Sequence, residues 1–302
     1  HVLVVDHQHR AHRALVRIRD GSDRNCNGFD WRHRDHYVCR YQRQPHNERR
    51  IRGLALFQLR YCVHQQLEAP HGRLSSAVAM RLVTAILARD EAAPDRYLRR
   101  VLTRCAEFSD AILVLDDGST DATAAIAREA GGVVHTRRGA AAWGAEAPAR
   151  QELWERAAAL ADGGWVLICD ADMLLVGDPR PLTYSWDVAS WAWPLVDLWD
   201  SEETFRVDGA WQFGPRTPRP WLFRPSVGGA NFAAQWGTRG IHVGHAPANF
   251  GDAGPSAVAP DLFWKHLAYV QREHREAKAA QYAATAAQLT AFERAHAASI
   301  LD

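Results

Sequence analysis

The chain has 302 residues, and 36 lysines and arginines against 35 aspartates and glutamates give a formal net charge of +1. Apolar residues make up 47% of the sequence and charged residues 24%, which is ordinary for a globular protein. Because the net charge is near zero, we do not expect bulk binding of nucleic acid. No apolar run reaches the ~18 residues of a membrane-spanning helix. The five cysteines form no CxxC pair and are odd in number, so no disulfide framework is expected and a cytoplasmic location is favoured.

Residues 1–72 differ in composition from the rest of the chain. The first 70 residues hold eight of the fifteen histidines, and thirteen arginines against seven acidic residues. We expect 1–72 to be a basic, histidine- and arginine-rich extension that is poorly ordered, because it can bury too little apolar surface to offset its chain entropy. A basic arm for acidic partners is one alternative. The other is a zinc module, which would use Cys26, His33, His36 and Cys39 in a spacing that fits no common zinc pattern.

From residue 73 onward the pattern predicts one α/β domain, 73–302. Strands are expected at 78–88, over the strand and turn 111–120, and at 131–136 and 165–172; helices are expected at 94–108, 121–131 and 147–162. This alternation predicts a mostly parallel sheet that is covered on both faces. After residue 176 the sequence is rich in tryptophan and proline, which favours short strands and loops, and 262–297 reads as one or two helices.

Pairs of carboxylates end two of the predicted strands. Asp116 and Asp117 follow one apolar run, and Asp170 and Asp172 follow another in "WVLICDADMLL". Burying such groups without partners costs several kcal/mol. Because ligands bind beyond the carboxyl ends of parallel strands, we expect both pairs to line one crevice. An Asp-x-Asp pair suits Mg²⁺ or Mn²⁺, which often share oxygen ligands with a diphosphate; a solvated acidic turn is the alternative.

Three segments in this order resemble family 2 glycosyltransferases with a GT-A fold: "TAILARDEAAPDRYLRRVL", "LVLDDGSTDAT" and "WVLICDADM". The resemblance is good over about 80–176 and looser in "PWLFRPS" and "WKHLAYVQREHREAKAAQYAA". It implies a Rossmann-like, mostly parallel sheet flanked by helices, with a nucleotide-sugar-binding half (73–176). The other half (177–302) would be a Trp-rich acceptor side with C-terminal helices.

The resemblance also implies an activity. The enzyme would use Mn²⁺ or Mg²⁺ to move a sugar from a UDP- or GDP-type donor to an acceptor hydroxyl, with inversion. The acceptor is not specified by the sequence; a glycan and a lipid-linked molecule are the classes considered. No nucleic-acid partner and no integral membrane segment are expected, and the location would be cytoplasmic or peripheral at the membrane.

Site residues are carried over by position. The nucleotide would contact Thr84, Ala85, Asp90, Glu91, Asp116, Asp117 and Arg150. Asp172 would be the principal metal ligand, with Asp170 nearer the ribose or the sugar. Late histidines often support the metal or diphosphate in the family, so His242, His245 and His266 are assigned to the metal.

A general base is expected in the acceptor half, where a carboxylate must take the proton of the attacking hydroxyl. The carboxylates in question are Asp197, Asp200, Glu202, Glu203 and Asp208. Asp200 and Asp197 rank first, because they lie among tryptophans that could stack on a sugar, although a tryptophan cluster is more often core packing.

Two other functions stay open. A relative that binds nucleotide sugar without turnover would keep the same pocket. A haloacid-dehalogenase-type phosphatase would use Asp170 as nucleophile and Asp172 as acid/base, but it also needs a downstream lysine within its core. A sugar-nucleotide pyrophosphorylase lacks support, since "ILARDEAAP" contains no glycine-rich loop.

Overall fold

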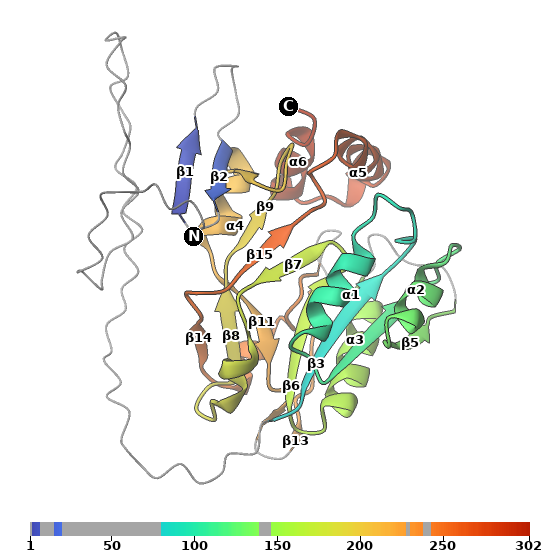
Figure 1. The fold of residues 1–302 in the computed structure, drawn as a ribbon, viewed down its shortest axis with the longest axis vertical. Coiled ribbons are helices and arrows are strands. Elements are labelled where there is room, and N and C mark those ends of the chain that lie inside the picture. Colours follow the sequence, from blue (N-terminus) through green and yellow to red (C-terminus); the bar gives the residue numbers. More distant parts are fainter. Residues whose placement is uncertain (1, 7–14, 20–79, 139–145, 228–229, 238–242) are drawn as a thin grey trace, which may run out of the picture.

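The computed structural model describes residues 2–6, 15–19, 80–138, 146–227, 230–237 and 243–302 (Figure 1). The predicted zinc ligands, most of the predicted extension 1–72, and His242 lie outside these described residues. The interpretation of 1–72 therefore stays a prediction.

The helices are α1 (Leu98–Ala106), α2 (Thr123–Glu129), α3 (Ala147–Ala161), α4 (Phe213–Arg216), α5 (Arg272–Ala284) and α6 (Ala291–Ala298). The strands up to residue 200 are β1 (Val2–Asp6), β2 (Leu15–Arg19), β3 (Leu82–Ala88), β4 (Ala111–Asp116), β5 (Val133–Thr136), β6 (Trp165–Asp170), β7 (Met173–Val176), β8 (Ser190–Trp193) and β9 (Leu195–Asp197). Later strands are β10 (Thr204–Arg206), β11 (Arg219–Phe223), β12 (Ser226–Val227), β13 (Ala230–Asn231), β14 (Ser256–Val258) and β15 (Phe263–His266). Short 3₁₀ segments cover Arg180–Tyr184, Gly209–Gln212, Phe250–Ala253 and Ala286–Gln288.

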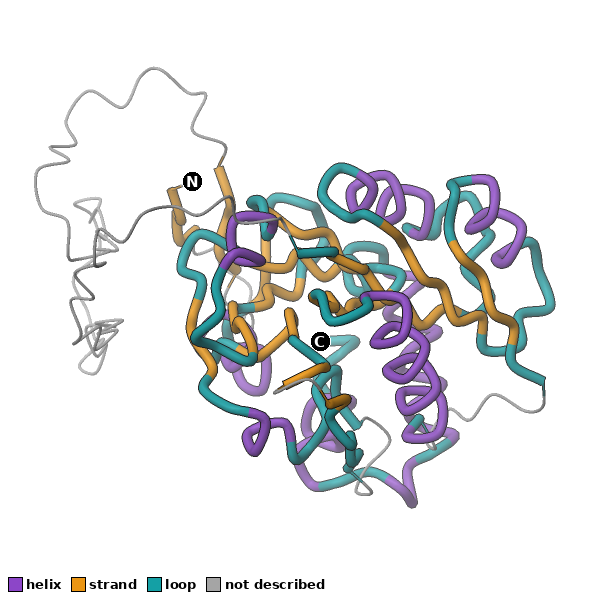
Figure 2. The backbone as a smooth tube through the Cα atoms, turned by 90° about the horizontal axis from the view of Figure 1, so that it is seen from below, coloured by secondary structure: helices purple, strands orange, loops and turns teal. Residues whose placement is uncertain are grey.

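The main sheet has the strand order β14-β8-β11-β6-β3-β4-β5 within the described residues. Its β6-β3-β4-β5 part is parallel, as predicted, and β11 joins it through antiparallel pairs with β6 and β8. Figure 2 shows helices on both sides of these strands. The fold is therefore mixed α/β, with a mostly parallel centre.

The two faces of the sheet are buried by different helices. On one face Leu82 and Ile86 of β3 pack in a cluster with α1, whose buried residues recur at the helical spacing Leu98, Val101, Leu102 and Cys105. On the other face Val83 and Ala85 pack in a cluster with α3 residues such as Leu153 and Trp154. The period-two alternation of β3 thus gives each helix one apolar surface to cover.

A smaller sheet, β7-β15-β9, corrects the helix expected over 262–297. Residues Phe263–His266 form a strand that runs antiparallel to β7 and parallel to β9. The helical pattern begins only at Arg272. Short strands of this kind are fixed by pairing partners far away in the sequence, which a local apolar pattern does not contain.

The C-terminal helices cover the small sheet's end through an aromatic cluster. Trp199, Trp211 and Tyr269 pack together with ring centroids 4.7–5.7 Å apart. Tyr282 of α5 and Ile300 beyond α6 complete the cluster. Figure 1 shows α5 and α6 beside each other beyond the end of β15. Among the helices that the structure describes, none has the length and apolar character needed to cross a bilayer.

Candidate functional site

The acidic ends of β4 and β6 flank the end of β3. In the sheet register, Ala88 of β3 lies opposite Asp116, and Leu87 lies opposite Asp170. Neighbouring strands are about 4.8 Å apart, so the two strand ends lie about 10 Å from each other. Both acidic pairs therefore lie at the same edge of the sheet, where open α/β sheets bind ligands.

Asp170 is held by two basic side chains. Its Oδ1 accepts a hydrogen bond from Arg150 Nη2 at 3.0 Å, and its Oδ2 lies 2.8 Å from His245 Nε2. Burial opposes ionisation, but His245 and Arg150 outweigh it and hold the pKa of Asp170 well below its ordinary value. Burial lowers the pKa of His245 itself, so the lasting positive charge comes from Arg150. The ring of His245 also packs against the ring of Trp221.

Asp172 lies in the turn between β6 and β7 and faces His266. Its Oδ2 is 3.4 Å from His266 Nε2, while His266 Nδ1 lies 2.7 Å from Asp197 Oδ1. The small sheet explains this arrangement, because His266 lies opposite Asp197 in the parallel pair and opposite Met173 in the antiparallel pair. Burial opposes the charge on His266, but the two carboxylates raise its pKa to about 9.

Two carboxylate oxygens at this edge are buried without a hydrogen-bond partner. They are Asp172 Oδ1 and Glu91 Oε2. Burial, and then the charge of Asp172, raise the pKa of Glu91 to about 8. The backbone N–H of Glu91 donates to Thr123 Oγ1 at 2.7 Å, which fixes the loop after β3 against the start of α2. The two orphaned oxygens mark the place where the site lacks positive charge.

The β4 end carries a second group of charges. Asp116 is buried and accepts a hydrogen bond from the Ser119 backbone N–H at 3.1 Å, so it stabilises its own turn. Asp117 forms an ion pair with Arg137, and Arg137 Nε also lies 3.2 Å from Glu152. Asp117 is therefore the member of the pair that is held in place by a cation.

Arg137 was missed in the sequence. It follows β5, the strand next to β4, and its backbone N–H donates to Asp116 at 2.8 Å. The signal was available, since Arg137 comes directly after the predicted strand 131–136 and so falls at the same edge of a parallel sheet.

Thr84 and Ala85, which are expected to contact the nucleotide, do not reach this edge. Both are fully buried in the middle of β3, and the Thr84 hydroxyl is 2.6 Å from Ser109, at the opposite end of the sheet. Asp90 is also engaged, with the neighbouring loop after β4. It has a positive φ of 52° and accepts a 2.8 Å hydrogen bond from the Thr120 backbone.

Most of the expected base residues are paired away from the acidic edge. Asp200 bonds Arg275 at 2.7 Å, Glu202 makes a two-pronged pair with Arg100, and Asp208 makes one with Arg206. The backbone N–H of Glu203, at the surface, donates to Ser201. Asp197 is the member of this set that shares a contact with the acidic edge, through His266. Burial opposes its ionisation, but His266 outweighs it and keeps the pKa of Asp197 below the ordinary value.

The tryptophans near these residues are core residues. Trp193 and Trp199 have no exposed surface, and the same is true of Trp165 and Trp264. The alternative of core packing is thus confirmed for Trp193 and Trp199, and neither offers a free ring face to a sugar.

No group of three or more histidine, cysteine or acidic side chains is arranged to hold a metal ion among the described residues. His245 and His266 each contact one carboxylate of the Asp-x-Asp pair instead. His242 lies outside the described part, so its assignment stays a prediction.

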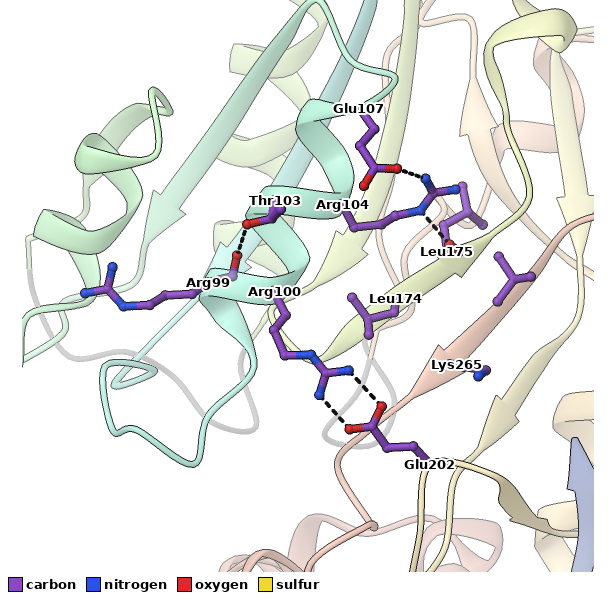
Figure 3. A pocket seen from close by; sticks show the side chains of 10 residues that line it. Arg99, Arg100, Thr103, Arg104, Glu107, Leu174, Leu175, Glu202 and Lys265 are labelled. Carbon is purple, nitrogen blue, oxygen red and sulfur yellow. Dashed lines mark hydrogen bonds and ion pairs between the residues drawn. The ribbon is translucent and has the colours of Figure 1, made fainter. Parts of the chain in front are cut away.

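A separate groove lies between α1, β7 and β15 (Figure 3). Its volume is about 480 Å³, and its lining includes Arg100, Glu202 and Lys265. Since neighbouring residues of a strand point to opposite faces, Lys265 faces this groove while His266 faces Asp172. The groove is therefore distinct from the acidic edge.

A protein-family model matches part of the chain. Residues 86–178 match the family model described as glycosyl transferase family 2. Comparison with curated proteins found no match. The chain is similar to a solved structure of S. aureus TarS, with 18% identity over 40% of this chain and 22% of that one, and a TM-score of 0.28.

Glucosyl-3-phosphoglycerate synthase from Mycobacterium tuberculosis is also similar. A complex with Mn²⁺, UDP-glucose and phosphoglyceric acid has 21% identity over 39% of this chain and 44% of that one, with a TM-score of 0.29. A complex with Mn²⁺, UDP and glucosyl-3-phosphoglycerate has 16% identity over 67% and 76%, with a TM-score of 0.39. The chain thus spans less than half the length of the first two structures. The stretch 86–178, which carries both acidic strand ends, is the part of the chain that matches glycosyl transferase family 2.

Proposed function

We propose that the chain is a glycosyltransferase that moves a sugar from a nucleoside-diphosphate donor to an acceptor hydroxyl, with a divalent cation at Asp172. The observation that carries this proposal is that the strand ends leading into Asp117 and Asp172 lie on either side of the β3 end, within the segment that matches family 2. A UDP-type donor is favoured, because the similar S. aureus and mycobacterial structures include complexes with UDP-GlcNAc and UDP-glucose.

The residues at the edge fit a hard cation. Asp172 Oδ1 and Glu91 Oε2 are buried oxygens without partners, and oxygen is the ligand that Mg²⁺ and Mn²⁺ prefer. Such ions are often held by one or two carboxylates and completed by substrate phosphates, so a three-residue protein cluster is not required. Asp172 would hold the cation with Glu91 beside it, and the cation would act there as a Lewis acid on the diphosphate.

The chain's own residues have separate tasks. Arg150 and His245 hold Asp170 ionised and in one orientation toward the donor. Asp117, fixed by Arg137, accepts hydrogen bonds from the nucleoside. Asp197 is the general base of our proposal, because it is ionised, half-buried and joined to Asp172 through His266. Inversion follows if the acceptor oxygen, whose proton this base takes, attacks the anomeric carbon on the face opposite the departing diphosphate.

The phosphatase alternative is disfavoured by the contacts of Asp170. A nucleophilic carboxylate needs a free oxygen, but one oxygen of Asp170 bonds Arg150 and the other bonds His245. A relative that binds without turnover shares every contact described above, and hydrolysis or transfer assays separate it from an enzyme.

The test is calorimetric titration of UDP and GDP, with and without Mn²⁺, into the wild type and Asp172→Asn. We expect Mn²⁺-dependent binding that the variant weakens by more than the roughly 10–100-fold typical of losing an outer partner of a metal ligand. Asp187→Asn removes an exposed carboxylate outside the site and serves as the control, with unchanged affinity expected. Equal binding by Asp172→Asn and the wild type would refute the cation assignment.

A further inference from the structure

Lys278, on α5, lies next to an aromatic residue that contacts the acidic edge. Its Nζ lies 4.9 Å from the ring centroid of Tyr269, and that ring packs edge-on against His266 with the centroids 5.4 Å apart. His266 in turn contacts Asp172. Contacts from Lys278 to Tyr269, and from Tyr269 to His266, thus lead to Asp172, the carboxylate assigned to the cation.

The ammonium group of Lys278 has no ionic partner among the described residues. Among the described residues, its ammonium forms no hydrogen bond or ion pair and rests on an aromatic face. A half-buried cation that rests on the ring beside His266, and that bonds no carboxylate, can form its ion pair with an anion that enters the site.

We propose that Lys278, resting on Tyr269, is a phosphate-binding residue on the side of the site opposite Asp117. The inference rests on the proposed function and extends it, because it places a phosphate contact on α5, beyond the family 2 segment 86–178. Lysine suits this task as a compact point charge with three donors. The anchoring of α5 through Tyr269 then ties the C-terminal helices to ligand binding.

The chain supplies its own control, because Lys265 is its only other lysine. Lys265 faces the groove of Figure 3, where its charge acts on Glu202 and not on the acidic edge. Both ammonium groups can be acetylated with an amine-reactive ester and quantified separately by mass spectrometry. The ratio of the two modification rates reports protection of Lys278 independently of activity.

The experiment compares the free protein with protein saturated by UDP, uridine or inorganic pyrophosphate, all with Mg²⁺. We expect UDP and pyrophosphate to slow acetylation of Lys278 several-fold relative to Lys265, while uridine leaves the ratio unchanged. If UDP leaves Lys278 reactive but inorganic phosphate added to the UDP complex protects it, the bound phosphate belongs to the acceptor. Absence of protection by UDP, pyrophosphate and added phosphate alike overturns the proposal.

Variants complete the test by calorimetry. Lys278→Gln should weaken UDP binding about tenfold, the equivalent of one charged hydrogen bond, while Lys278→Arg and Lys265→Gln keep most of it. UDP binding that is unchanged in Lys278→Gln argues against a donor phosphate. If the wild type binds neither UDP nor GDP, the proposed function fails, and protection by pyrophosphate or phosphate still decides the role of Lys278.

Discussion

The two carboxylates of the Asp-x-Asp pair are stabilised by different partners. Asp170 has the permanent charge of Arg150, which is buried and 3.0 Å away. Asp172 depends on His266, whose charge is present only while the imidazole is protonated. The electrostatic balance of the Asp172 side therefore varies with pH in the metal-free protein, whereas Asp170 keeps the charge of Arg150 throughout.

The stability of the metal-free protein should fall as pH rises from about 6.5 to about 9. His266 has a folded pKa of about 9 against 6.5 for the free side chain, so its contribution is fully present below pH 6.5 and is lost as pH passes 9. The difference corresponds to on the order of 3 kcal/mol in the free energy of unfolding. Urea unfolding across this range, in chelator, measures it.

The comparison variant is His266→Gln. Glu91, with a pKa of about 8, titrates in both proteins, so the difference between their profiles isolates His266. A wild-type profile with the same slope as the variant between pH 6.5 and 9 would contradict the assignment of charge to His266.

Arg137 should determine how firmly Asp117 is presented to a nucleoside. Arg137→Gln removes the ion pair with Asp117 and the contact with Glu152, so we expect UDP affinity to fall about tenfold. Arg138→Gln changes the neighbouring exposed arginine and should leave the affinity unchanged. Calorimetry on both variants checks this, and equal losses would show a non-specific charge effect.

The acidic residues were predictable because carboxylates directly after continuous apolar strands conflict with burial. Their partners were less so. His245 and His266 were found as late histidines, but their pairing with Asp170 and Asp172 depends on contacts 75 and 94 positions apart in the numbering. The distance of Thr84 from the edge could not be predicted, because the sequence of β3 does not show at which residue the strand reaches the edge.

At the scale of elements, the parallel half followed from local patterns. Each of β3, β4 and β6 is an apolar run, and α1 shows the helical spacing of its buried residues. The small sheet did not follow, since β15 is four residues long and pairs with strands about 70 and 90 residues earlier. Local propensity decides little for such strands, and non-local pairing decides the rest.

The connection from α3 into β6 is a tight element that can be tested. α3 ends at Asp162 in the left-handed region, and a Cβ added at Gly164 would lie 2.1 Å from the backbone oxygen of Arg81. That oxygen accepts a hydrogen bond from the Trp165 N–H at 2.7 Å, so it cannot move without loosening the pairing of β3 with β6. Gly164→Ala should lower the free energy of unfolding by about 1–3 kcal/mol in urea titrations.

Gly237→Ala is the matched control, because no atom lies within 4 Å of a Cβ built there. It should unfold at the wild-type urea concentration. A Gly164→Ala protein as stable as this control would show that the α3–β6 turn relaxes freely.

At the scale of the whole molecule, the site depends on both halves of the chain. Asp117, Asp170 and Asp172 come from the segment that matches family 2, whereas Asp197 and His266 come from the small sheet. The aromatic cluster under α5 and α6 joins these parts, because Tyr269 contacts Trp199 and Trp211 on one side and His266 on the other. A change in this core should therefore alter both stability and ligand binding.

Trp211→Ala tests that connection. Trp211 is 1% exposed, packs against Tyr269 and donates from Nε1 to Ser299 at 2.9 Å, so its removal leaves a large cavity. Truncation of a buried tryptophan costs about 3–5 kcal/mol, which lowers Tm by on the order of 10 °C. We expect UDP affinity to fall as well, measured below the Tm, because Tyr269 no longer holds His266 and Lys278 in place.

Trp186→Ala truncates a tryptophan that is 63% exposed, and it should change neither quantity. A Trp211→Ala protein with lower Tm but wild-type affinity would confine the aromatic cluster to a structural role.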